Sequence, residues 1–168
     1  MTESVTTKLT MTSEREKSST FGAVVFVVDE NYRFFVIKEL SRNIERKRNP
    51  GEFGVFCESR KPKEGWVGNI RRTLVEETGI AEDRFRDVFD FSDWSLWETG
   101  FVDKVWATVI KIKCKDPDLF SELFGKGCDP DRVESVGWRT LEEFRNMKPL
   151  REGVVKVLDK FETDIFKK

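Results

Sequence analysis

The sequence predicts a mixed α/β protein, an α/β/α sandwich with a mixed central sheet. Three observations carry this prediction: strand-like apolar segments lie on both sides of one central helical segment, further helical segments end the chain, and no internal repeat or linker divides it. The 168 residues suit one domain, because domains usually contain about 100–200 residues. Residues 1–18 are rich in Thr, Ser, Glu and Lys, so we expect a flexible tail there and a single domain over 19–168.

Hydrophobic periodicity places the individual elements. Residues 21–28 form a β-branched apolar run of strand length, and the turn residues at 29–31 make this strand the first half of a hairpin. The central helix is expected over 66–78, because Val67, Ile70 and Leu74 repeat at helical spacing and Gly79 suits a left-handed C-cap. The remaining expected strands are 32–37, 53–57, 83–92, 101–114 and 133–138, and the remaining helices are 117–124, 141–147 and 150–166.

The composition excludes several classes of chemistry. The chain contains no His, which removes Ser-His-Asp triads, His-bound zinc and imidazole bases. Its three Cys show no CxxC spacing, so we expect reduced thiols and a cytoplasmic protein. The net charge of −1 argues against a duplex nucleic acid partner. The longest apolar run is too short to cross a membrane, which needs about 20 residues.

A cluster of carboxylates marks the central helix as the candidate site. Residues 73, 76 and 77 share one face of this helix, and Glu64 lies shortly before it. Adjacent carboxylates such as Glu76 and Glu77 repel each other in water and become favourable when a hard divalent cation binds between them. The alternative is a solvated helix face on which Arg72 pairs with Glu76 at i,i+4, worth about 0.3–0.5 kcal/mol.

The segment from Glu64 to Ile80 resembles the Nudix box, G-x5-E-x7-R-E-U-x-E-E-x-G-U, in which U is apolar. Seven of the nine specified positions match. The matching residues are Glu64, Arg72, Leu74, Glu76, Glu77, Gly79 and Ile80. The resemblance extends over about 19–158 and implies the Nudix-like form of the α/β/α sandwich. It also implies Mg²⁺, or alternatively Mn²⁺, held by Glu64, Glu76 and Glu77 and oriented by Arg72.

Two positions depart from the box. Glu58 replaces the opening Gly, which removes easy access to positive φ. Thr73 replaces the Glu after the motif Arg, a carboxylate that in the family binds metal or helps to deprotonate water. We expect Thr73 to position water without accepting its proton, at a cost of up to about 10²–10⁴-fold in rate if general-base action is lost. Glu134 or Asp131 could substitute as the base, although both read more simply as ordinary loop charges.

A basic segment precedes the central helix and suits phosphate. Residues 42–63 contain seven basic and three acidic side chains, a composition that suits phosphate. A solvated basic loop is the alternative explanation. Trp94, expected on a loop or hairpin, could stack on a base or could belong to the core. The residues that we select for substrate binding are Arg42, Arg46, Arg48, Arg60, Lys61 and Trp94.

The resemblance therefore implies a pyrophosphohydrolase acting on acid anhydrides. Its substrate would be a nucleoside diphosphate linked to another moiety, and a homodimer is consistent with the family. Thr73 and Glu58 support a different hypothesis, a non-catalytic module of the same fold that binds a nucleotide or a partner. The isopentenyl-diphosphate isomerase branch is disfavoured by the absence of His. An unrelated α/β domain with an accidental match is the remaining alternative.

Overall fold

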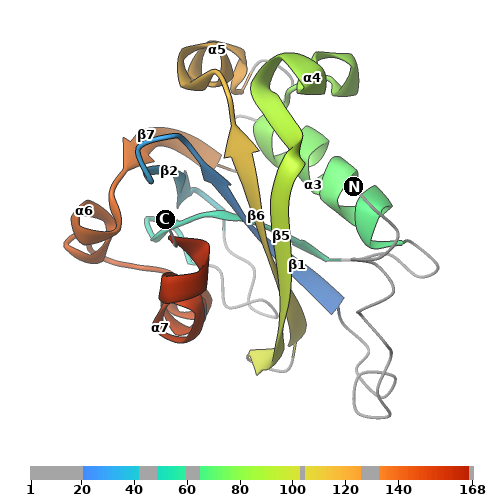
Figure 1. Cartoon of the computed structure of the whole chain (residues 1–168). Helices are drawn as coiled ribbons and strands as arrows, with labels where there is room; N and C mark the ends of the chain where they lie inside the picture. The colour runs from blue at the N-terminus through green and yellow to red at the C-terminus, as the bar shows by residue number, and fades with distance from the viewer. Residues whose placement is uncertain (1–20, 42–48, 60–64, 103–104, 126–132, 167–168) are drawn as a thin grey trace.

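The computed structural model describes residues 21–41, 49–59, 65–102, 105–125 and 133–166 (Figure 1). The predicted tail over residues 1–18 lies outside them. The strands are β1 (Phe21–Val28), β2 (Phe34–Glu39), β3 (Phe53–Gly54), β4 (Phe56–Ser59), β5 (Phe89–Val102), β6 (Val105–Cys114) and β7 (Val133–Arg139). The helices are α3 (Trp66–Thr78), η1 (Glu82–Arg84), α4 (Phe85–Val88), α5 (Pro117–Leu123), α6 (Leu141–Arg145) and α7 (Glu152–Ile165).

The strands form one sheet of seven strands, which is mixed as predicted. Its main path runs β3-β2-β1-β6-β5, with β4 paired to β1 and β7 paired to β2. The β1–β6 pair is parallel, whereas the other strand pairs are antiparallel. β1 and β6 can run parallel because the long stretch of chain between them, which includes α3, provides the crossover connection that parallel neighbours require.

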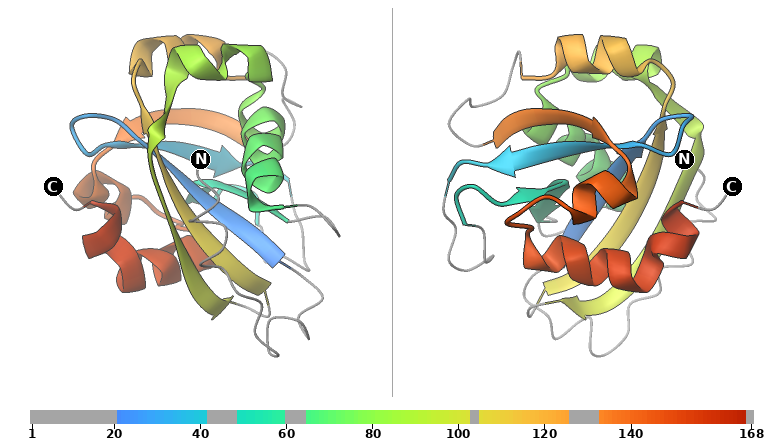
Figure 2. Two further views of the ribbon diagram at one scale, coloured as in Figure 1. Left: turned by 45° about the vertical axis from the view of Figure 1, so that its right-hand side comes forward. Right: turned by 90° about the vertical axis from the view of Figure 1, so that its left-hand side faces the viewer.

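Helices cover both faces of this sheet, which confirms the predicted sandwich. Figure 2 shows α3 on one side and α6 and α7 on the other. Alternate residues of β1 divide between the two layers, since Val25 and Val27 join the core on the α3 side while Phe26 and Val28 join the core on the α7 side. Successive strand side chains point to opposite faces, so a strand that is apolar throughout serves both layers.

The central helix begins and ends where the sequence predicts. Its C-cap Gly79 has φ 71° and ψ 8°, and the Gly79 amide donates to the carbonyl of Val75 at 2.9 Å. Because most residues disfavour this left-handed conformation by about 1–2 kcal/mol, Gly is the residue that ends the helix cleanly here.

Replacing Gly79 by Ala is expected to lower the free energy of unfolding by about 1 kcal/mol, because the added Cβ strains a left-handed residue. Urea denaturation followed by circular dichroism measures this change. Asn tolerates the left-handed region, so Gly79→Asn provides the matched control and should cost clearly less. Equal losses for the two variants would show that the backbone conformation is not the cause.

The predicted strand over 83–92 is wrong in its first half. The chain instead forms the 3-10 turn η1 and the short helix α4 before β5 begins at Phe89. Phe85 and Val88 are both buried, and their spacing of three places them on one side of the helical turn.

The predicted loop between two strands at 94–100 is also wrong. β5 continues through this segment because Trp94 to Glu98 pair in register with Ile112 to Thr108 of β6. The register shifts between Asp90 and Trp94 and again near Gly100, which are the places where the sequence resembles a turn.

Smaller differences concern the first hairpin and the strand that follows it. β2 begins at Phe34 and not at residue 32, because Tyr32 adopts φ 60° within the turn. The expected strand over 53–57 is divided into β3, which pairs with β2, and β4, which pairs with β1.

Within the described residues, no helix has both the length and the apolar character needed to span a bilayer. Cys57 and Cys114 are buried thiols, in keeping with the expected reduced state, and Cys128 lies outside the described residues. Burial raises the pKa of the Cys114 thiol to about 12, so this thiol stays protonated and is a poor nucleophile at neutral pH.

Candidate active site

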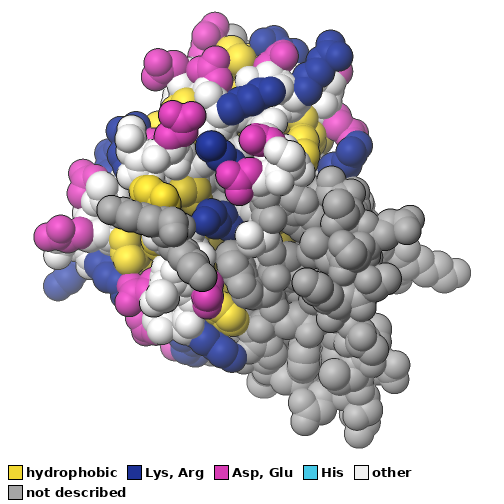
Figure 3. Space-filling model, viewed as in Figure 1, with side chains coloured by type: hydrophobic (Ala, Val, Ile, Leu, Met, Phe, Trp, Pro, Cys, Tyr) yellow, Lys and Arg dark blue, Asp and Glu magenta, His cyan; other side chains and the backbone are white. Residues whose placement is uncertain are grey.

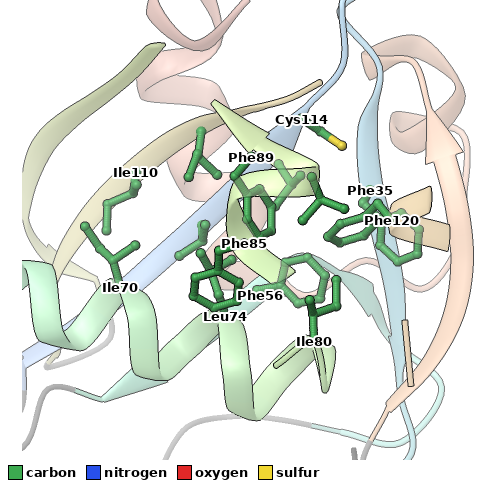
Figure 4. Packing of buried hydrophobic residues seen from close by; sticks show 14 of the residues in the cluster. Phe35, Phe56, Ile70, Leu74, Ile80, Phe85, Phe89, Ile110, Cys114 and Phe120 are labelled. Carbon is green, nitrogen blue, oxygen red and sulfur yellow. The ribbon is translucent and has the colours of Figure 1, made fainter. Parts of the chain in front are cut away.

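The candidate site is built on α3, which is held to the sheet by its apolar side. Ile70 and Leu74 are fully buried and lie among Phe56, Phe85 and Ile110 in the core (Figure 4). The helix packs chiefly against β4 and β1. Burying two large aliphatic side chains contributes about 1.5–3 kcal/mol each, so the helix is a rigid platform for its polar residues.

A second buried stripe on α3 is polar. Asn69 and Thr73 are fully buried and Glu77 is 2% exposed, and the three residues are spaced four apart, which places them one above another along the helix. Burying a carboxylate is costly unless compensating partners surround it. Glu77 is therefore the member of the glutamate pair that the fold holds on the inner side of the helix.

Glu76 lies beside this stripe on the exposed flank of the helix. Its side chain is 37% exposed, and its Oε2 accepts from Nη1 of Arg72 at 3.1 Å, with Arg72 itself only 17% exposed. The contact is the i,i+4 pair expected from the sequence. It fixes one side of the Glu76 carboxylate in place, although its own contribution to stability is small.

Thr73 is bonded to its own helix. Its hydroxyl donates to the carbonyl of Asn69 at 2.7 Å, and the residue has no exposed surface. A hydrogen bond to the carbonyl four residues earlier satisfies the hydroxyl of a Thr inside a helix. The Thr73 hydroxyl proton is therefore engaged within the helix, and the expectation that Thr73 positions water stays a prediction.

The C-terminal end of α3 is fixed by Thr78, which the sequence reasoning did not single out. The Thr78 hydroxyl donates to the carbonyl of Leu74 and accepts from the amide of Ile80 at 3.1 Å. The Thr78 carbonyl accepts from the amide of Gly125, just after α5. Asn69 was also missed, and its spacing of four from Thr73 was the available signal in the sequence.

Most of the predicted phosphate ligands cannot be placed against the helix. Arg42, Arg46, Arg48, Arg60 and Lys61 lie outside the described residues, as does the predicted metal ligand Glu64. Their assignment remains a prediction.

Trp94 lies in β5 and not on a loop, in register with Ile112 of β6. Of the two alternative bases, Asp131 lies outside the described residues, and Glu134 is exposed on β7 opposite Lys38. Sequence proximity alone suggested Glu134, and nothing in its surroundings strengthens the suggestion.

The side chains of the predicted metal site can be compared with the ligands that Mg²⁺ prefers. Carboxylate oxygens are the donors that Mg²⁺ prefers, and the consecutive residues Glu76 and Glu77 both carry them. Among the residues that the structure describes, no three Cys, Asp or Glu side chains come together as a metal site. The described donors fit part of a magnesium site, and the predicted third ligand belongs to the segment before α3.

No protein-family model matches the chain, and no curated protein sequence matches it. Solved structures do. The fold resembles DR0079 from Deinococcus radiodurans, with a TM-score of 0.58 and 12% identity, covering 84% of this chain and 82% of that one. It also resembles a Nudix hydrolase from Nitrosomonas europaea, with a TM-score of 0.55 and 13% identity, covering 88% and 90%.

A third similar structure is the C-terminal domain of mouse MUTYH, solved in complex with human PCNA. The TM-score is 0.55 at 14% identity, and the match covers 87% of this chain and 89% of that chain. The chain therefore has a Nudix-like α/β/α sandwich fold. Because a fold hosts many functions, the activity must be argued from the site.

Proposed function

We propose that this protein is a Mg²⁺-dependent hydrolase of the Nudix type. It would cleave the pyrophosphate bond of a nucleoside diphosphate linked to another moiety. The observation that carries the proposal is Glu77, a carboxylate only 2% exposed on the inner side of α3, next to Glu76 on the flank of the same helix. Two adjacent carboxylates on a rigid helix, one of them buried, are an arrangement that a divalent cation stabilises.

Each residue of the motif has a defined task in this proposal. Glu76 and Glu77, with Glu64, would hold Mg²⁺ or Mn²⁺, and Arg72 keeps the Glu76 carboxylate oriented through its hydrogen bond. When bound, the ion would polarise the diphosphate and lower the pKa of water beside it. The cationic residues Arg42, Arg46, Arg48, Arg60 and Lys61 would bind phosphate oxygens, and Trp94 would contact the base.

The partner expected from this chemistry is a small molecule. Basic and acidic side chains are interspersed over the described part of the face seen in Figure 3, which favours neither duplex nucleic acid nor an anionic membrane. A cytoplasmic location and a homodimer complete the proposal.

The first test is a metal-dependent substrate screen. We expect phosphate-containing products from at least one member of a panel of nucleoside diphosphate derivatives, with Mg²⁺ or Mn²⁺ and not with excess chelator. Ca²⁺, which binds oxygen ligands with looser geometry, serves as the comparison ion. Product analysis by anion-exchange chromatography identifies the bond that breaks. No turnover of any member with either ion would contradict the proposal.

A second candidate function is a binding module of the same fold that does not turn over its ligand. Thr73 favours it, because a buried, hydrogen-bonded hydroxyl occupies the position where the resemblance expects a carboxylate. The similar MUTYH domain, solved in complex with PCNA, supports this option by analogy alone. Nucleotide binding measured by calorimetry, without products in the screen, would favour this candidate.

Introducing the missing carboxylate separates the two candidates. Thr73→Glu is expected to raise the rate per folded molecule, because it restores a metal ligand or base one turn before Glu77. The larger side chain enters a fully buried position, so we also expect a loss of about 1–3 kcal/mol in unfolding free energy.

The matched control for this experiment is Thr73→Gln, which adds the same bulk without the charge. It should destabilise the fold to a similar degree and leave the rate unimproved. If Glu and Gln change the rate equally, the absence of a carboxylate at this position does not limit the reaction.

A further inference from the structure

A cavity of about 190 Å³ lies where the β1–β2 turn meets β5 and β6. This volume is below the range of about 300–1,000 Å³ found for pockets that bind drug-sized ligands, which suits a small metabolite and not a nucleotide. The residues that form its walls are Asp29, Glu30 and Tyr32 of the turn, Asp93 of β5, and Lys111 and Lys113 of β6.

The turn on one side of the cavity is rigidly built. Asp29 is 5% exposed, and its carboxylate accepts from the amides of Asn31 and Arg33 at 2.9 Å and from Nε of Arg33 at 2.8 Å. These bonds hold Tyr32 at φ 60°, a conformation that is costly for a bulky residue. Such residues persist where their surroundings over-determine them and are frequent at ligand-binding sites.

Two lysines of β6 line the cavity. Lys111 and Lys113 are in parallel register with Phe26 and Val28 of β1, which belong to the core on the α7 side. Residues in register share a sheet face, so both lysines lie on that face and are half-buried there. The intervening residue Ile112 belongs to the opposite core.

Carboxylates also line the cavity. Glu30 and Asp93 are exposed, and Asp93 lies at the register shift of β5, where a bulge redirects the strand. Asp93 lies 4.0 Å from Nζ of Lys113, at the limit of an ion pair. Arg33 neutralises Asp29 within the turn.

The charges of this cavity are only partly paired with one another, since Asp93 and Lys113 form an ion pair at 4.0 Å. Lys111 makes no ion pair with any residue that the structure describes, and neither does Glu30. A half-buried ammonium group is stabilised by an anionic partner, and the exposed carboxylates in the same cavity would repel a simple anion. A ligand that suits both kinds of side chain carries a negative end for the lysines and a positive end for the carboxylates.

We propose that this cavity binds a free α-amino acid. Its carboxylate would pair with Lys111 and Lys113, its ammonium group would face Glu30 and Asp93, and its side chain would lie beside Tyr32. A divalent cation is a poorer occupant because the lysines repel it. The cavity lies on the α7 face of the sheet, whereas α3 covers the other face, so this proposal is independent of the hydrolase proposal.

The test uses the whole protein and the twenty common L-amino acids, added one at a time. We expect at least one of them to shift the amide resonances of Asn31, Lys111 and Lys113 in two-dimensional NMR spectra, in a saturable manner. The same compound lacking its amino group, and again lacking its carboxylate, is expected to bind at least about tenfold more weakly. The absence of a saturable shift with every amino acid would overturn the proposal. Equal binding of the compound without its amino group would overturn it too, because the cavity would then be a site for a simple anion.

Substitutions then locate the binding groups. Lys111→Gln and Glu30→Gln are each expected to weaken binding by about tenfold or more. The matched controls are Lys115→Gln, at an exposed lysine just beyond β6, and Glu122→Gln, on the exposed side of α5. These controls should bind normally. Unchanged affinity in both Lys111→Gln and Glu30→Gln, with saturable shifts retained, would place the ligand elsewhere.

Discussion

Replacing Glu77 by Gln is expected to lower kcat/KM for Mg²⁺-dependent hydrolysis by more than about 100-fold. Even residues that only support a metal ligand cost about 10–100-fold when they are changed, and Glu77 is proposed as a ligand itself. The Gln side chain has nearly the same volume, so the buried position should still be filled. Steady-state kinetics over a range of Mg²⁺ concentrations measures the loss and shows whether more metal restores the rate.

The matched control for Glu77 is Glu82→Gln. Glu82 is 53% exposed and pairs with Arg71 at 2.8 Å, so its replacement should leave the rate and the metal dependence unchanged. Glu76→Gln is expected to lower turnover as well, because Glu76 is the second proposed ligand. Unchanged turnover in either Glu76→Gln or Glu77→Gln would refute the assignment of that residue to the metal.

The largest effect on stability is expected for Phe35→Ala, with a loss of about 3–5 kcal/mol in unfolding free energy. Phe35 is fully buried at the centre of the aromatic cluster on the α3 side. Its ring stacks on Phe56 at 6.0 Å between centroids and meets Phe120 edge-on at 4.7 Å and Trp138 at 5.4 Å. Removing the ring leaves a cavity that the four surrounding elements, β2, β4, α5 and β7, would have to fill by moving inward.

Urea denaturation with parallel fluorescence and circular dichroism measures this loss. Leu40→Ala is the control, since Leu40 directly follows β2 and is 39% exposed, and its replacement should change stability by less than about 0.5 kcal/mol. A small effect of Phe35→Ala would mean that the surrounding rings can collapse into the space, contrary to the close packing described above.

The elements that were predicted well are those whose local signals agree with their tertiary environment. In α3, the apolar spacing of Ile70 and Leu74 and the left-handed capacity of Gly79 point to the same helix, and the sheet then buries that same stripe. The apolar run of β1 was recognisable for a related reason, because a strand buried on both faces needs no polar alternation.

The incorrect predictions lie where the residue pattern fits both a helix and a strand, or where pairing with another strand determines the structure. Phe85, Val88 and Phe89 permit either a helical turn or the start of a strand, and the core selects the turn. Trp94 to Gly100 contains turn-like residues, yet β6 supplies backbone partners along nearly its whole length, so the segment is a strand. Non-local hydrogen bonds of this kind leave no trace in a local window.

The order of residues along the chain determined the layered architecture, the central helix with its cap, and the presence of paired glutamates on that helix. Only the tertiary structure decided which of those glutamates is buried and which is exposed, because burial depends on the strands that pack against each side of the helix. It also decided that Thr73 bonds to its own helix and that two lysines of β6 line a separate cavity. These features arise from contacts between residues distant in sequence, which spacing along one chain cannot encode.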